Sequence, residues 1–257
     1  MRYLTRMTAA SLWLVCAVGM AAIPDDPLES PQWDSMVAKH LGEDAEIVFD
    51  DRVRVLSAGY AEDAMETPVM VEAPDLPDVE SVVVFADLNP ITKILEYYPE
   101  RAAPTLSFRF KIQQATPVRA AMRTADGVWH VGGMWIEAAG GGCTAPSVAA
   151  GSPIWESRLG EISGKAWARG PERERLRFRV VHPMDTGLAA GIPVFHITDV
   201  TLATPAGETL ARLKPFEPVS ENPVISVNLR YRGPVALSGR DNNGNRFAAT
   251  LPAPAAP

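Results

Sequence analysis

Short stretches of alternating apolar and polar residues, interrupted by glycine and proline, constrain the fold of this chain more than any other feature. The stretch from Arg173 to His182 is the clearest, because arginines alternate there with leucine, phenylalanine and valine. A period of two places successive side chains on opposite faces of a β-strand. The chain of 257 residues also holds 23 prolines and 19 glycines. This composition favours short strands joined by turns.

Two series of predicted strands follow from this pattern. The first series comprises Arg52 to Ser57, Pro68 to Ala73, Ser81 to Ala86, Thr105 to Ile112, Pro117 to Thr124 and Val128 to Ala138. The second series comprises Arg173 to His182, Val194 to Ala203, Thr209 to Lys214, Val224 to Tyr231, Val235 to Ser238 and Arg246 to Leu251. We therefore expect an all-β protein with two small sandwiches of about six strands each.

A short helix is expected before the first series. Ser30 suits the N-cap and Pro31 the first helical position, and apolar residues then recur at helical spacing, namely Trp33, Met36, Val37 and Leu41. The expected domain map is a signal peptide at 1–22, a first sandwich at 23–150, a linker at 151–172 and a second sandwich at 173–257.

Residues 1–22 have the features of a secretory signal peptide. Arg2 and Arg6 precede an apolar run from Ala9 to Met20, and small residues around Ala21 suit cleavage. The run is too short for a transmembrane helix, and Val15 is too large for the lipoprotein signal that Cys16 would otherwise suggest. We therefore expect export, with a retained anchor as the alternative.

The charge of the chain argues against two classes of partner. Without Arg2 and Arg6, 22 basic and 31 acidic residues remain, which gives a net charge of −9. So acidic a chain is a poor candidate for binding nucleic acid or an anionic membrane. One predicted strand is nevertheless basic along one face, through Arg173, Arg175, Arg177 and Arg179. A solvated strand face is the favoured interpretation, and a basic partner site is the alternative.

Cys143 is the only cysteine that remains after the signal peptide, and it follows Gly140, Gly141 and Gly142. A single cysteine cannot close an internal disulfide, so in an exported chain it is either reactive or intermolecular. Glycine has no side chain to bury and adopts positive φ freely. We therefore expect a mobile, solvent-accessible arm, with a small residue packed in a tight glycine turn as the alternative.

No basic residue lies near Cys143 in the sequence. We therefore expect a thiol with an ordinary pKa of about 8.5 that reacts slowly in the isolated protein. A Cys143→Ser substitution on an exposed arm should change stability by less than about 0.5 kcal/mol. Folding could alter this expectation by bringing Arg175 or Arg177 close to the thiol.

The usual catalytic and metal-binding patterns do not occur. There is no G-x-S-x-G, H-E-x-x-H or C-x-x-C, and the four histidines are scattered. A soft copper site built from His182, Met184, Met134 and Cys143 is conceivable, but nothing in the spacing demands it. We therefore predict no catalytic residue, no metal and no resident cofactor.

Residues 241–244, Asp-Asn-Asn-Gly, predict a hairpin turn and not a calcium loop.

Several motifs resemble those of a known carrier system. Residues 81–143 resemble SoxY, the sulfur-carrying subunit of bacterial thiosulfate oxidation, through Asp87-Leu88-Asn89-Pro90, Leu106-Ser107-Phe108-Arg109-Phe110, Ala125-Asp126-Gly127 and Gly141-Gly142-Cys143. The segment from Val180 resembles its partner SoxZ, through His182-Pro183-Met184-Asp185-Thr186-Gly187, Val194-Phe195-His196-Ile197 and Ser220-Glu221-Asn222-Pro223-Val224-Ile225-Ser226. The order of the motifs is similar to that of fused SoxYZ-like carriers associated with quinoprotein dehydrogenases.

The resemblance implies two immunoglobulin-like sandwiches packed as a pair, in a periplasmic protein that is not itself an enzyme. In the family, a cysteine receives a covalent sulfur substituent and presents it to periplasmic enzymes. That role falls here on Cys143, with Gly140, Gly141 and Gly142 as its arm. The implied partners are sulfur-oxidation enzymes or a quinoprotein dehydrogenase.

The alternative is a non-catalytic accessory or binding module for a quinoprotein (PQQ) dehydrogenase, in which Cys143 is incidental. One departure from the family bears on the arm. SoxY ends in Gly-Gly-Cys-Gly-Gly, whereas Thr144-Ala145-Pro146 follow Cys143 here and the chain continues. An arm tethered at both ends reaches less far than a free terminus.

Overall fold

The computed structural model describes residues 23–148 and 153–255. The expected signal peptide at 1–22 lies outside the described residues. Within the described part of the chain, no helix has the length and apolar character needed to cross a membrane.

The expectation of an all-β protein is confirmed. The described residues contain two short helices, α1 (Trp33–His40) and α2 (Pro153–Arg158). The strands of the first half are β1 (Ile47–Phe49), β2 (Arg54–Leu56), β3 (Tyr60–Ala61), β4 (Thr67–Glu72), β5 (Val79–Ala86), β6 (Lys93–Tyr98), β7 (Ala102–Phe110), β8 (Thr116–Thr124) and β9 (Trp129–Ala138). Those of the second half are β10 (Ile162–Ala168), β11 (Glu174–Val180), β12 (Ile197–Ala203), β13 (Thr209–Pro215), β14 (Val224–Leu229), β15 (Val235–Asp241) and β16 (Arg246–Leu251).

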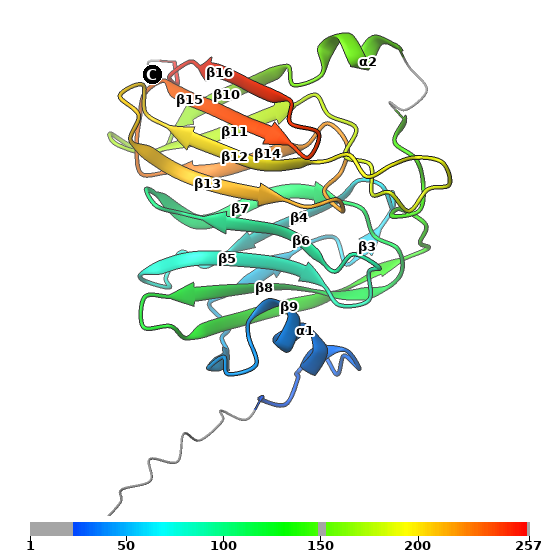
Figure 1. Ribbon diagram of the computed structural model, residues 1–257. Helices are drawn as coiled ribbons and strands as arrows, with labels where there is room; N and C mark the ends of the chain where they lie inside the picture. The colour runs from blue at the N-terminus through cyan, green and yellow to red at the C-terminus, as the bar shows by residue number, and fades with distance from the viewer. Residues whose placement is uncertain (1–22, 149–152, 256–257) are drawn as a thin grey trace, which may run out of the picture.

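These strands form two layered sheets (Figure 1). The ten-stranded sheet has the order β1-β9-β8-β5-β6-β13-β12-β15-β16, with β3 paired to β9. The six-stranded sheet has the order β10-β11-β14-β7-β4-β2. Alternation explains how each strand is oriented: in β11, Leu176, Phe178 and Val180 are buried, whereas Arg177 and Arg179 are exposed.

The two halves of the chain are joined strand to strand in both sheets. In the ten-stranded sheet β6 pairs antiparallel with β13, so that Tyr97 lies opposite Leu213. In the six-stranded sheet β7 pairs antiparallel with β14, so that Ser107 lies opposite Ser226. One hydrophobic core runs between the sheets through both halves. The halves therefore share their hydrogen-bond ladders and their core.

The structure differs from the expected elements at several places. Strands β1, β3 and β6 were not predicted, although β6 is the strand that pairs with β13. The segment 151–172, expected as a linker, contains α2 and the edge strand β10. Most of β10 is exposed, and an edge strand with one open side does not need strong apolar alternation. Helix α1 begins at Trp33, two residues later than expected, because Gln32 occupies the N-cap.

A buried arginine attaches the N-terminal segment to the ten-stranded sheet. Arg119 Nε donates to both carboxylate oxygens of Asp87, at 3.1 and 3.0 Å, and its terminal nitrogens donate to Asp26 at 2.8 and 2.6 Å. The guanidinium also lies over the Trp33 ring, 4.5 Å from its centroid. A buried cation flanked by two carboxylates is stable only while every partner is present.

We predict that Arg119→Ala destabilises the protein by about 3–5 kcal/mol, because Asp87 would remain buried without its cation. Urea unfolding would measure this loss. Arg123→Ala is the matched control, since Arg123 is exposed on the same strand, and it should cost less than about 0.5 kcal/mol. Equal effects of the two substitutions would show that the buried cluster does not stabilise the fold.

Candidate functional site

Cys143 is buried in a turn that follows β9, with an exposed fraction of 0%. The expectation of a solvent-accessible thiol was therefore wrong for this conformation. The next residue, Thr144, is exposed, so the thiol lies only one layer beneath the surface.

The three glycines are fixed by close backbone contacts, which also contradicts the expectation of a mobile arm. Gly141 N donates to Gln113 O at 3.1 Å and Gly142 N donates to Ile112 O at 3.0 Å. A Cβ atom on Gly142 would lie 2.0 Å from Ala64 O, and one on Gly140 would lie 2.5 Å from Gln113 O. Gly140 and Gly141 also adopt φ of +98° and +93°, where glycine is favoured. The structure thus shows the tight glycine turn.

Cys143 is held by residues from both halves of the chain. Its thiol donates to Lys111 O, with a sulfur–oxygen distance of 3.4 Å, and its backbone N–H donates to Gln113 Oε1 at 3.2 Å. From the second half, Thr186 Oγ1 donates to Cys143 O at 2.6 Å. Both the backbone N–H and the backbone carbonyl of Cys143 are therefore hydrogen-bonded in this conformation.

Residues 182–187, which we call the covering loop, make three hydrogen bonds around the cysteine turn. Besides the Thr186 bond, Lys111 Nζ donates to Met184 O, and Asp185 Oδ1 accepts from Ser147 N at 3.1 Å. Met184 has a φ of +54°, an uncommon conformation for a residue with a side chain. The covering loop therefore belongs to the second half but closes a site of the first half.

The structure brings together motifs that lie far apart in the sequence. Asn89 Nδ2 donates to Lys111 O at 3.0 Å, and Asn89 Oδ1 accepts from Gln113 N at 2.9 Å. Glu221 Oε2 accepts from Val148 N at 2.7 Å. Residues 87–90, 141–143, 182–187 and 220–223 thus meet around one turn. These motifs carried the resemblance to SoxY and SoxZ.

Two polar residues of the site, Lys111 and Gln113, were not singled out from the sequence. Lys111 lies near the end of the predicted strand Thr105 to Ile112 and Gln113 directly follows it, where polar residues are common, so the pattern gave no signal for them. Arg175 and Arg177 were the cations considered for activating the thiol. They make no recorded contact with Cys143 and lie instead on the outer face of the six-stranded sheet.

The electrostatics of the closed site disfavour the thiolate. Burial raises the pKa of the Cys143 thiol to about 11, and the charge of Lys111 opposes this rise only in part. Burial also lowers the pKa of Lys111, against the charges of Asp185, Cys143 and Glu221. The thiol is therefore protonated at neutral pH, and Lys111 is the cation placed to activate it.

Within the described residues, no three His, Cys, Asp or Glu side chains form a metal-binding group. His182 is buried, with Nε2 lying 3.6 Å from Asp241 Oδ2 and Nδ1 accepting from Met184 N at 3.1 Å. Burial lowers the pKa of His182 to about 4, so the ring is neutral near pH 7. Asp241 begins the β15–β16 turn, which is a hairpin as predicted.

One family model matches part of the first half of the chain. Residues 37–143 match the family model of sulfur oxidation protein SoxY. The solved sulfur carrier protein SoxY from Chlorobium limicola f thiosulfatophilum is 16% identical, with a TM-score of 0.37, over 41% of this chain and 90% of that protein.

A second solved structure is similar over a larger share of this chain. The β-glucuronidase of Parabacteroides merdae is 9% identical, with a TM-score of 0.26, over 79% of this chain and 24% of the enzyme. The comparison with curated proteins gives no significant match. The SoxY resemblance seen in the sequence is thus confirmed for residues 37–143, a segment that ends at Cys143.

We predict a specific loss of stability between about pH 8.5 and pH 11. The thiol pKa is about 11 in the folded protein and about 8.5 in the unfolded chain. The unfolded state therefore ionises first, and wild-type stability falls through this window. The fall relative to Cys143→Ala should be on the order of 3 kcal/mol, at about 1.36 kcal/mol per pKa unit.

Urea unfolding of both proteins at pH 8, 9, 10 and about 11 would measure that difference. A constant difference between them would show that the thiol titrates equally in both states. It would therefore contradict the burial of Cys143.

Proposed function

We propose that this chain is a periplasmic carrier that holds a sulfur-containing group covalently on Cys143 and presents it to partner enzymes. The observation that carries the proposal is the SoxY family match over residues 37–143, because it ends at the only cysteine of residues 23–257. The basic start, apolar run and small residues of 1–22 support a periplasmic location.

The described conformation is then the closed, resting state of the carrier. A fully buried thiol cannot meet a partner, so residues 140–148 must move before sulfur is transferred. The covering loop holds this segment and the adjoining Lys111 through three hydrogen bonds, each worth about 1 kcal/mol on average. Thr144 and Val148 are exposed, so a local opening can release the turn while both sheets stay intact.

Opening would also change the electrostatics of the thiol. It removes the burial that raises the thiol pKa, and it takes Met184 O away from the ammonium group of Lys111. The ammonium then becomes available to pair with the thiolate. Lys111 is thus a positioning and activating residue in this proposal, and Gly140, Gly141 and Gly142 form a turn that unfolds into an arm.

The attachment step needs no oxidant when the donor already contains a sulfur–sulfur bond. The Cys143 thiol loses its proton to solvent or to a partner base, and the thiolate attacks the outer sulfur of the donor. A new sulfur–sulfur bond forms on Cys143. The old bond breaks, and the leaving group departs with its electron pair. The carrier itself supplies only a nucleophile, so the chemistry before and after belongs to the partners and the carrier is not an enzyme.

The residues of the second half support a fused SoxYZ-like arrangement. The covering loop contains the motif that resembles SoxZ, and it closes over the cysteine of the SoxY-like half. A covalent link between the halves keeps this loop at a high local concentration. A quinoprotein dehydrogenase as the partner rests on the family resemblance alone.

A second candidate function is a non-catalytic accessory module for a quinoprotein dehydrogenase. The burial of Cys143 favours it, since a buried thiol with a raised pKa is inert and serves the packing of the turn. The two candidates differ in one respect that can be measured, namely whether Cys143 is ever modified.

We predict that the protein, purified without reductant from cells that express it naturally, carries a mass increase equal to one or more sulfur-containing groups. Intact mass spectrometry would detect the increase, and a reducing agent should remove it, because the bond to Cys143 is reducible. The Cys143→Ser variant, isolated in the same way, is the control and should have its bare mass. An unmodified thiol under conditions of active sulfur metabolism would favour the accessory module.

A further inference from the structure

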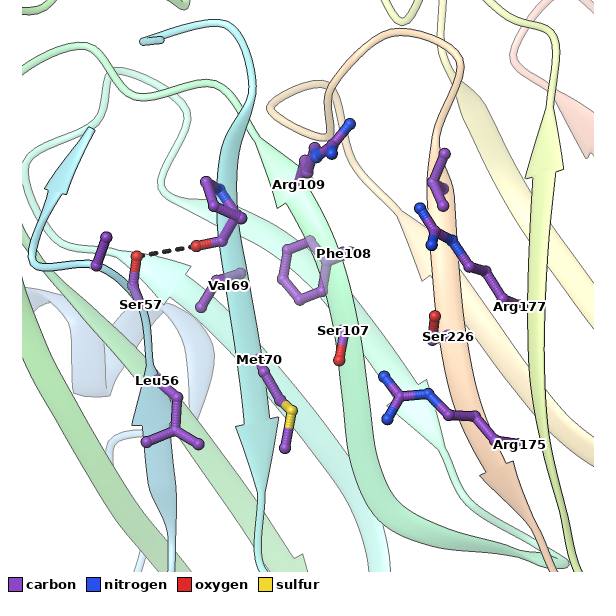
Figure 2. A pocket seen from close by; sticks show the side chains of 13 residues that line it. Leu56, Ser57, Val69, Met70, Ser107, Phe108, Arg109, Arg175, Arg177 and Ser226 are labelled. Atoms are coloured by element: carbon purple, nitrogen blue, oxygen red, sulfur yellow. Dashed lines mark hydrogen bonds between the residues drawn. The ribbon is translucent and has the colours of Figure 1, made fainter. Parts of the chain in front are cut away.

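A groove of about 480 Å³ lies on the outer face of the six-stranded sheet, away from the shared core. Figure 2 shows Arg175 and Arg177 extending from β11 across β14, toward the small side chains of Ser226 and Ser107. Leu56 and Met70 stand on the opposite side of these serines. The groove therefore has a basic wall, a floor of small hydroxyl residues and an apolar wall.

The strand register shows that this arrangement crosses the whole sheet. One row of paired residues runs through all six strands, in the order Lys165, Arg177, Ser226, Ser107, Met70 and Leu56. Neighbouring strands lie about 4.8 Å apart, so this row is roughly 24 Å wide. That width exceeds what a small inorganic anion can contact, and it is comparable to one side of a protein–protein interface.

The positive charges of the basic wall lack carboxylate partners. Within the described residues, Lys165, Arg175 and Arg177 form no salt bridge. By contrast, a guanidinium nitrogen of Arg109 at the groove rim lies 3.0 Å from a carboxylate oxygen of Glu66. Glu72 pairs with Arg54 in the same way. A chain with a net charge of −7 thus concentrates these three cations on the adjacent strands β10 and β11. Such a local field attracts a negatively charged partner.

Large apolar side chains are exposed on both sides of the groove. Trp167 pairs in register with Arg175 and is 39% exposed, and Leu56 on the far edge strand is 44% exposed. Lys165 Nζ lies 5.6 Å from the Trp167 ring centroid. Tryptophan and arginine are the residues most enriched among those that dominate binding energy at protein interfaces. This composition favours a protein partner over a free ion.

We propose that this groove binds an acidic segment of a partner protein. Carboxylates of the segment contact Arg175 and Arg177, and its apolar side chains pack against Met70 and Leu56. Strand β7 carries Ser107 and Arg109 of the groove and ends at Phe110, one residue before Lys111 of the cysteine site. A partner bound here is held beside the turn that contains Cys143. The binding itself does not depend on sulfur chemistry at Cys143.

The test uses a fluorescein-labelled peptide, Glu-Glu-Ser-Glu-Glu-Ser-Leu-Leu, which covers roughly 27 Å when extended. Its binding to the full protein is measured by fluorescence anisotropy at low salt, where the overall negative charge of the chain opposes non-specific binding. The double substitution Arg175→Glu/Arg177→Glu should weaken binding by about tenfold or more. The matched control Arg123→Glu/Arg246→Glu makes the same change in charge at exposed arginines of the other sheet, and it should weaken binding by less than about twofold.

Three results would overturn the proposal. These are no binding of the acidic peptide, equal weakening by both double substitutions, and displacement of the peptide by sodium sulfate at an ionic strength where sodium chloride has no effect. The last result would assign the groove to a small oxoanion. Thermal unfolding confirms that each variant is folded, and Arg175→Gln/Arg177→Gln replaces the charge reversal if it is not. The Cys143→Ser variant should bind the peptide like wild type, so this test is independent of the carrier function.

Discussion

Strand β7 pairs with β14 and β6 pairs with β13, and these two pairings organise the whole molecule. These ladders fix the second half of the chain against the first in both sheets. They place the covering loop, residues 182–187, over a cysteine that lies about 40 residues earlier in the sequence. They thereby hold Thr186 and Met184 within hydrogen-bonding distance of Cys143 and Lys111.

Alternation in the sequence was sufficient to predict most strands but not the state of the cysteine. The regular pattern of residues 173–182 predicted β11, and the hairpin at Asp241 was predicted from its turn residues. The glycines before Cys143 were ambiguous, because glycine permits both a mobile arm and a close backbone approach. The close approach of Gly142 to Ala64 O and of Gly140 to Gln113 O decides between the two conformations. Such long-range contacts leave no local pattern.

The same long-range packing gives the thiol two opposing influences. Burial holds it protonated and inert, while Lys111 provides a cation that can stabilise the thiolate once the site opens. In the proposed periplasmic carrier, a sheltered thiol would avoid unwanted oxidation between transfers. Arg109 at the rim of the basic groove precedes Lys111 of the cysteine site by two residues in the chain.

The proposed carrier function requires Cys143 to become accessible by a local opening and not by global unfolding. The most direct test is the rate of thiol labelling in native protein at increasing, sub-denaturing urea concentrations. If the opening is local, its free energy lies well below that of global unfolding and hardly depends on urea, and labelling is faster in Thr186→Val. Labelling that requires the full unfolding free energy, with the full urea dependence, would contradict it and would make Cys143 a residue of the core.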